Sequence, residues 1–354
     1  MALLEYTNRT VPDVVKKAVP SFYSRDPYLK RLRSNGMVKR SGGTNVRVVR
    51  IKSGHSDEVQ IDATNISVPL NKKETLSNMT GDWGKVIKPI ILPHISLDRM
   101  SSKDEVKRYI NDMSTAAMSG LMNRVCRQLY LGNVATLTQL GTLSGNVTGL
   151  TSTGFENGAL RFQTPTAQAA AAVTYLGETR VEDTTNFEDN WYNQFVAHNG
   201  FGTDFLQTAE EVKITADSFC EDETGISLGV LSIADHVQLS EEVRTYPGGG
   251  GVSAINYTVD DIKAGKSHPT VVMAGGVQYF ANRWMTDALV GSTDACYLLN
   301  PLGCEWWVNA NNDFRVTEFT DHLKTSNQDA DIGYIILEVQ SAVPNLLISG
   351  CTSQ

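Results

Sequence analysis

Cysteine is scarce in this 354-residue chain, and its five copies are scattered and odd in number. None of them forms a CxxC pair, so the sequence indicates neither a disulfide framework nor a cysteine-based zinc site. Free, buried thiols are the expected state of all five. They are Cys126, Cys220, Cys296, Cys304 and Cys351.

Long apolar runs are also missing. None approaches the roughly 20 residues that a bilayer-crossing helix needs, so no membrane association is expected. The apolar start of the chain is broken at once by Glu5 and Arg9, which argues against a secretory signal. We therefore expect the chain to fold in a reducing cytoplasm.

Motifs that carry catalysis are absent as well. The six histidines are isolated from one another, and no GxSxG sequence is present. Residues 264–267 resemble the end of a phosphate-binding loop, but Asp260 stands where that motif needs glycine. Acidic pairs such as Glu210–Glu211 could do acid–base chemistry, although solvated surface charge is the simpler interpretation. The sequence therefore predicts no enzyme, no cofactor and no metal site.

Charge is distributed very unevenly. The first 50 residues hold 11 Lys and Arg against three acids, a net +8, which leaves 20 bases against 36 acids, a net −16, for the rest. A basic segment on an acidic body can contact the acidic body of a neighbouring copy, or nucleic acid. It could also be a solubilising tail that touches nothing. The first two interpretations point to partners rather than to an active site.

The beginning of the chain is expected to be an extended arm. It covers residues 1 to about 44, allows one short helix at residues 14–18, and ends in a glycine hinge at residues 41–43. Three prolines support this interpretation: Pro12, Pro20 and Pro27.

Two runs that follow, residues 45–52 and 85–92, alternate in polarity and predict two strands. Turn signals fill the interval between them, so we expect a long hairpin with a mobile tip. Pro89 assigns the second strand to a sheet edge. Because a two-stranded ribbon is marginal in water, this one is expected to lie on something else.

The clearest helix begins after Ser102, where Ser102 and Glu105 form a capping box. Apolar residues then recur at three- and four-residue spacing as far as Gly132, which predicts about 30 helical residues, roughly 45 Å. That length is more than twice the average for a globular helix. Its methionine-rich stripe is expected to be core packing rather than a ligand groove.

The remainder is mixed and then rich in strands. Expected elements are loops at 133–160, helices at 167–175, 205–220 and 235–245, a strand at 229–233, and mainly strands from residue 270 onward. Trp306 and Trp307 are expected in the core or at a subunit interface, with base stacking as a lesser alternative.

This order of elements resembles the major capsid protein of tailed bacteriophages, the Hong Kong 97-type fold. Residues 295–301 (ACYLLNP) resemble a strand near the end of that family's axial segment. Residues 327–334 (NQDADIGY), with 335–339 and 345–348 after them, resemble its closing strands. The resemblance covers nearly the whole chain as an order of elements.

The resemblance implies an α+β fold with an N-terminal arm, a long β-hairpin E-loop, a spine helix, and axial (A) and peripheral (P) domains. The implied boundaries are an N-terminal arm at 1–45, the E-loop hairpin at 46–97, the spine helix of the P domain at 98–134, mainly the axial domain at 135–300, and C-terminal strands completing both domains at 301–354.

The implied function is self-assembly into the icosahedral head shell that encloses a phage double-stranded DNA genome. Expected partners are many copies of the chain, as hexamers and pentamers, together with scaffolding, portal and decoration proteins. DNA contact is expected only by non-specific proximity. The implied location is the virion, with assembly in the host cytoplasm. No scaffolding segment precedes the arm, so scaffolding would come from elsewhere.

Two alternatives remain: another non-enzymatic virion protein, such as a tail or decoration component, and a hydrolase that uses one acidic pair. If the chain is a capsid protein, the sites of interest are its contacts between subunits. Candidate contact residues come from the basic segment and the hairpin: Lys16, Lys17, Arg31, Arg33, Arg47, Arg50, Lys52, Lys72, Lys73 and Trp83.

Overall fold

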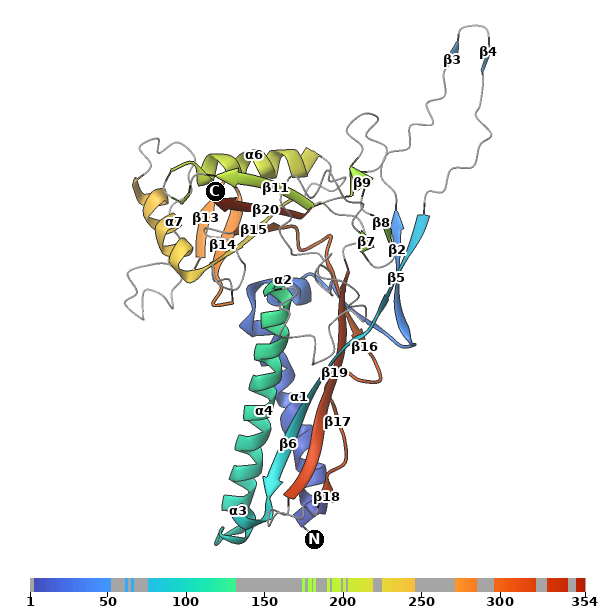
Figure 1. Ribbon diagram of the computed structural model, residues 1–354, viewed down its shortest axis with the longest axis vertical. Coiled ribbons are helices and arrows are strands. Elements are labelled where there is room, and N and C mark those ends of the chain that lie inside the picture. Colours follow the sequence, from blue (N-terminus) through green and yellow to red (C-terminus); the bar gives the residue numbers. More distant parts are fainter. Residues whose placement is uncertain are drawn as a thin grey trace. The chain divides into compact units, whose positions relative to one another are not determined.

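The chain divides into two compact units in the computed structural model (Figure 1). Unit 1 comprises Met1–Asn45, Asp82–Phe155 and Trp306–Gln340, and unit 2 comprises Val46–Gly81, Glu156–Glu305 and Ser341–Gln354. The structure describes residues 3–51, 61–62, 65–66, 76–131, 174–175, 178–179, 181–182, 190–191, 193–198, 200–201, 203–218, 225–245, 271–284, 296–322, 330–342 and 348–353.

Unit 1 begins with two helices, so the expected extended arm is wrong. Helix α1 spans Leu3–Arg25 with Pro12 and Pro20 inside it, and α2 spans Pro27–Ser34. One side of α1 is buried, including Val11, Val15 and Phe22, and the helix packs on α4 (Lys103–Leu131). The buried stripe explains why a helix forms despite two prolines, each of which removes a backbone hydrogen bond.

Local signals define α2 and its junction with α1. The carboxylate of Asp26 accepts hydrogen bonds from the backbone N–H of Tyr28 at 2.9 Å and of Leu29 at 3.1 Å. Pro27 occupies the first turn, where no N–H is needed. Residues 26–29 therefore form a helix N-terminus.

The sheet of unit 1 is built around the long strand β19 (Ala330–Ala342). Its strand order is β1-β16-β19-β17, and β6 and β18 also pair with β19. β6 runs antiparallel to β19 over ten residue pairs, from Pro93 opposite Ala330 to Gly84 opposite Val339. The other members are β1 (Val38–Ser41), β6 (Gly84–Pro93), β16 (Glu305–Asn309), β17 (Arg315–Val316) and β18 (Thr320–His322).

The long helix is confirmed as α4, 29 residues that follow the short helix α3 (His94–Asp98). Ser102 Oγ accepts from the Glu105 N–H at 3.2 Å, and the Glu105 carboxylate accepts from the Ser102 N–H at 3.3 Å, which is the expected capping box. The apolar stripe faces inward, with Ile110, Leu121 and Val125 each at most 1% exposed. Figure 1 shows α4 running beside α1 and β6, both of which it contacts.

The expected hairpin stem is wrong in its pairing. β2 (Asn45–Ile51) pairs with β5 (Leu76–Asp82), whereas the second expected strand is β6 and pairs with β19. The only other described part of the hairpin is the pair β3 (Ile61–Asp62) and β4 (Asn65–Ile66). Pro89 is consistent with an edge position, because β19 is the only described partner of β6.

The core of unit 2 is a mixed six-stranded sheet in the order β11-β20-β15-β12-β14-β13. Helix α6 (Phe205–Ser218) contacts β11 and β20, and α7 (Ile233–Thr245) contacts β13 and β14. Both helices occur where the sequence predicted helices. The strands are β11 (Asn193–His198), β12 (Leu228–Leu231), β13 (Val271–Ala274), β14 (Val277–Ala281), β15 (Cys296–Leu299) and β20 (Ile348–Ser353).

Unit 2 also has two short ribbons, β7 (Thr174–Tyr175) with β8 (Glu178–Thr179), and β9 (Val181–Glu182) with β10 (Asn190–Trp191). The expected loops at 133–160 lie outside the described residues, as does the expected helix at 167–175 except for its last two residues, which form β7. Three cysteines are confirmed as free and buried: Cys126, Cys296 and Cys304. In the described part of the chain, no helix is both long and apolar enough to cross a membrane.

Candidate inter-subunit surfaces

The outer face of the β6–β19 pair carries a continuous apolar strip. Alternate residues of β6 point inward and are buried, among them Val86, Ile90 and Leu92. The intervening residues point outward, and Ile87 and Ile91 are 45% and 44% exposed. Three successive cross-strand pairs make up this outer strip: Ile87 with Ile336, Pro89 with Tyr334, and Ile91 with Ile332.

Charge marks one end of the outer strip. The next outward pair is Lys85 opposite Glu338, whose Nζ and Oε1 atoms lie 3.7 Å apart. The Asn309 side-chain amide donates to the other Glu338 oxygen at 2.8 Å and holds it in place. The outer strip is therefore an apolar patch with a polar boundary, which is the usual form of a protein–protein contact.

The basic residues of the N-terminal segment are presented on helices. Lys16 and Lys17 are exposed on α1, and Arg33 is exposed in the last turn of α2, where Arg31 is half-buried. The Arg33 guanidinium lies 5.3 Å from the centre of the Tyr23 ring. The exposed members can reach a neighbouring molecule without unfolding the segment.

The ribbon formed by β2 and β5 has one buried and one exposed side. Val46, Val48 and Met79 are buried, while Val49 is 55% and Leu76 56% exposed. Among the expected contact residues, Arg47 is exposed but Arg50 is only 2% exposed, so Arg50 is not presented on the surface. Lys52, Lys72 and Lys73 lie outside the described residues.

Trp83, the last of the expected contact residues, is half-buried between β5 and β6. Its indole N–H donates to the Gly43 carbonyl at 3.1 Å. Trp306 is fully buried, so the expectation of a core or interface residue is met by a place in the core, and Trp307 beside it is half-buried.

Among the described residues of unit 1, two titratable groups have pKa values shifted from the ordinary ones. Burial, reinforced by the negative charge of Asp313, raises the pKa of Tyr23 to about 12. Hydrogen bonds from the Ser101 N–H, the Ser101 hydroxyl and the Ser102 N–H lower the pKa of Glu105. Both shifts arise from structural positions, one on the buried side of α1 and one at the start of α4.

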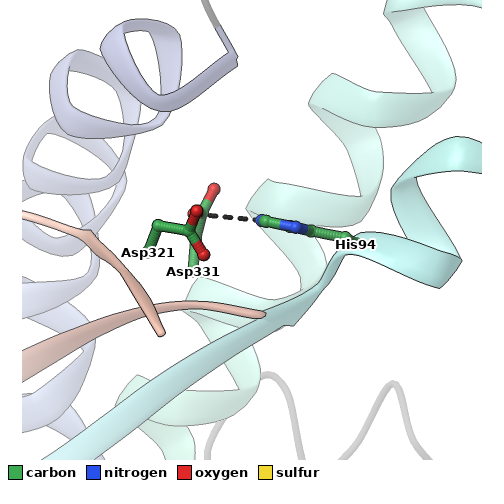
Figure 2. Close-up of side chains that lie close together, drawn as sticks. All are labelled: His94, Asp321 and Asp331. Atoms are coloured by element: carbon green, nitrogen blue, oxygen red, sulfur yellow. Dashed lines mark hydrogen bonds and ion pairs between the residues drawn. The ribbon is translucent and has the colours of Figure 1, made fainter. Parts of the chain in front are cut away.

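A histidine and two aspartates converge at one end of the same sheet (Figure 2). His94 begins α3 directly after β6, and its Nε2 lies 3.1 Å from Asp331 Oδ1 on β19. Asp321 on β18 is the cross-strand neighbour of Asp331. Each of the three residues offers one ligand atom, and these atoms all lie within 4.8 Å of one another. Among the described residues, they form a group that could hold a metal ion.

A small pocket in unit 2 lies between α6 and the turn that joins β13 to β14. Its volume is about 200 Å³, and Leu206, Lys213 and Tyr279 are among its lining residues. Ligand pockets typically span about 300–1,000 Å³. This pocket is below that range and adds no argument for a small-molecule substrate.

Comparison with solved structures identifies the fold. The chain is similar to a chain of the cyanophage A-1(L) capsid asymmetric unit, with a TM-score of 0.55 and 13% identity over 91% of this chain and 92% of that chain. It is also similar to a chain of the capsid of the native GTA particle, with a TM-score of 0.53 and 10% identity over 91% and 89%. No protein-family model and no curated protein match the sequence. The chain has the α+β fold of phage capsid proteins, as the sequence resemblance predicted.

Sequence reasoning missed both the outer strip and the His–Asp cluster. The outward isoleucines were visible in the sequence at residues 87 and 91, but their place depends on the pairing with β19, about 240 residues away. The cluster consists of residues 94, 321 and 331, so no short metal-binding motif in the sequence indicates it. Both features arise from strand pairing rather than from a motif.

Proposed function

We propose that this protein is a major capsid protein that self-assembles into the icosahedral head shell enclosing a phage double-stranded DNA genome. The observation that carries this proposal is the capsid fold, which extends over 91% of the chain and 92% of the cyanophage capsid chain. Such coverage leaves little of the chain for another domain. The role is structural, and its sites are surfaces between copies.

The outer strip gives this proposal a physical basis. Three apolar cross-strand pairs stand at the surface of the free subunit, and covering them with a neighbouring copy removes apolar area from water. A patch of about 300 Å² would contribute roughly 7 kcal/mol before association costs. A single contact of that size is weak once association costs are subtracted, but many contacts in a closed lattice act together.

We propose that the two units correspond to the two domains of the capsid fold. We assign the peripheral domain to unit 1, with α4 as its spine helix, and the axial domain to unit 2. The β2–β5 ribbon serves as the E-loop, and the basic helical segment α1–α2 replaces the extended N-terminal arm. Its exposed Lys16, Lys17 and Arg33 contact the acidic surface of neighbouring copies.

Partners follow from the same role. Copies of the chain form hexamers and pentamers, and scaffolding, portal and decoration proteins act during or after assembly. The net charge of −8 makes tight DNA binding by the shell unfavourable, so the genome is enclosed without specific contacts. Assembly takes place in the host cytoplasm, and the final location is the virion.

Electron microscopy of the full-length protein tests the proposal. Purified subunits, with and without a co-expressed scaffolding protein, are concentrated and imaged in negative stain. Shells or rings of capsomers are expected. Tubes or fibres would instead identify a tail component, and discrete particles at every concentration in both samples would overturn the proposal.

A matched pair of variants tests the outer strip. Ile91→Asp places a charge on the strip, at the end away from Lys85, whereas Ile214→Asp makes the same change at a 64% exposed isoleucine on α6. Because both side chains are at the surface, both variants should fold with near-wild-type melting temperatures. Ile91→Asp should abolish assembly or strongly raise the critical concentration that assembly requires. Ile214→Asp should have a smaller effect. Equal effects of the two changes would contradict a role specific to the strip.

Charge exchange tests the basic segment. A triple variant with glutamate should assemble more slowly than the matching triple variant with glutamine, since Glu adds repulsion to the loss of attraction. The substituted residues are Lys16, Lys17 and Arg33. Contacts at exposed seams are screened over about 8 Å at physiological salt, so wild-type assembly should slow as salt rises. Unchanged assembly of the Glu variant would show that the segment does not bind neighbours.

A further inference from the structure

We propose that His94, Asp321 and Asp331 bind one divalent transition-metal ion, of the zinc or manganese class, and that this ion fastens the end of β6 to the β18–β19 ladder. The site lies wholly within unit 1. It concerns the free subunit and does not depend on shell formation.

The spacing of one pair of ligand atoms fits a metal centre. Two atoms that each lie about 2.1 Å from one ion are about 3.0 Å apart at right angles and about 3.4 Å apart in a tetrahedron. The observed separation of His94 Nε2 and Asp331 Oδ1 is 3.1 Å. Figure 2 shows the Asp321 carboxylate near that of Asp331 and near the His94 ring; its ligand atom lies within 4.8 Å of the other two, and its exposed side chain can rotate to close that distance.

The electrostatics of the strand pair also call for a cation. Asp321 and Asp331 are directly opposite each other on antiparallel strands, where like charges destabilise a sheet. The Asp331 side chain is only 5% exposed, so its charge is poorly screened by water. Among the described residues, no lysine or arginine forms an ion pair with either aspartate. A divalent ion would neutralise both carboxylates at once.

The donor set selects the class of metal. Calcium and magnesium prefer all-oxygen sites, whereas an imidazole nitrogen with two carboxylates suits zinc, manganese and related ions. Three protein ligands leave at least one position for water. The ligands come from the β6–α3 junction and from the neighbouring strands β18 and β19, so a bound ion would cross-link two regions that are far apart in the sequence.

Metal titration of the unassembled full-length subunit is the test. After treatment with a chelator and dialysis, the protein is titrated with zinc, manganese and magnesium chloride by calorimetry. Thermal unfolding is followed in parallel. One site for zinc or manganese is expected, and at a hundredfold excess over Kd it should raise the unfolding midpoint by roughly 5–10 °C. Magnesium should produce a much smaller shift.

Variants separate this site from other histidines and thiols of the chain. Asp321→Asn is the main test, because Asp321 is exposed and its loss should leave the fold intact. It should weaken binding at least about tenfold. Asp98→Asn, at an exposed aspartate in α3 outside the cluster, is the matched control and should bind as the wild type does.

Cobalt provides a spectroscopic readout. Its visible absorption bands on the wild-type protein should lose intensity in His94→Gln and in Asp321→Asn, but not in Asp98→Asn. Equal affinity of wild type and Asp321→Asn for zinc and manganese would overturn the proposal, as would saturation only above about 1 mM. The cluster would then be an ion pair between His94 and Asp331. Shell formation is measured separately, so either result leaves the proposed function to its own test.

Discussion

Replacing Phe22 by alanine tests whether the basic N-terminal segment is part of the subunit core. Phe22 is fully buried on α1. Its ring makes edge-to-face contacts with Tyr23, at 5.0 Å between centroids, and with Phe314, at 5.1 Å. Phe314 adopts a left-handed backbone conformation with φ of 52°, which is uncommon for a non-glycine residue. Packing against Phe22 helps to hold it there.

The expected cost of Phe22→Ala can be derived from this environment. Truncating a buried phenylalanine to alanine costs about 3–5 kcal/mol, and loss of two aromatic pairs places the value toward the upper half of that range. Domain stability is about 5–15 kcal/mol, so the variant should lose about a quarter or more of it. With an m-value near 2 kcal/mol/M, the urea midpoint of unit 1 should fall by about 2 M.

Urea unfolding followed by near-ultraviolet circular dichroism, with hydrogen exchange of the α4 amides, measures this loss. Lys17→Ala is the control, because Lys17 is exposed on the same helix and should change stability by less than about 0.5 kcal/mol. Removal of residues 1–36 should expose the face of α4 that contacts α1 and prevent stable folding of unit 1. A cost below about 1 kcal/mol for Phe22→Ala would show that α1 is not a core element and that the arm is dispensable for folding.

Three further outcomes are expected. Gly333→Ala should destabilise unit 1 by about 1–3 kcal/mol in urea unfolding, since a Cβ there would lie 2.6 Å from the buried Phe319 ring, and Tyr334→Ala next to it should cost less. The raised pKa of Tyr23, about 12, gives stability that is complete below the unfolded pKa of about 10 and is lost as pH rises through 12. Alkaline unfolding monitored by tyrosinate absorbance should therefore show that the Tyr23→Phe variant loses less stability at high pH than the wild type does. The lowered pKa of Glu105 gives stability that is present above its ordinary pKa and is lost as pH falls through the lowered value, so Glu105→Gln should reduce the acid dependence of α4 hydrogen exchange.

Much of the fold was predictable wherever the information is local. The capping box at Ser102 and Glu105 and the apolar stripe after it located α4 almost to the residue. The helices α6 and α7 were predicted for the same reason. A helix closes its hydrogen bonds within itself, so periodicity and end signals are sufficient to find it.

The start of the chain was misread because prolines were taken as interruptions. Pro12 and Pro20 lie inside α1, which nevertheless forms because Thr7, Val11 and Val15 recur at four-residue spacing and are buried. That spacing was present in the sequence and could have been weighed against the prolines. Tertiary burial outweighed local propensity here, as it commonly does.

Strand partners could not be read from alternation. Residues 45–52 and 85–92 were correctly predicted as strands, but their mutual pairing was wrong because period two identifies a strand and not its neighbour. β5 was missed because the interval between the two predicted strands was interpreted as turns. The His–Asp cluster was missed for the same physical reason, since Asp331 reaches His94 only through the pairing of β6 with β19.

One signal of the proposed interface was nevertheless present in the sequence of β6. A strand with one face in water should be apolar on one side only, but residues 86–92 place isoleucines on both: Ile90 inward, and Ile87 and Ile91 outward. The inward face is accounted for by α4, which contacts β6. The outward face pairs with Ile332, Tyr334 and Ile336 of β19 and remains at the surface of the single chain. A strand that is apolar on both faces is typical of a layer covered on both sides, and the shell of many copies proposed above would supply the second cover.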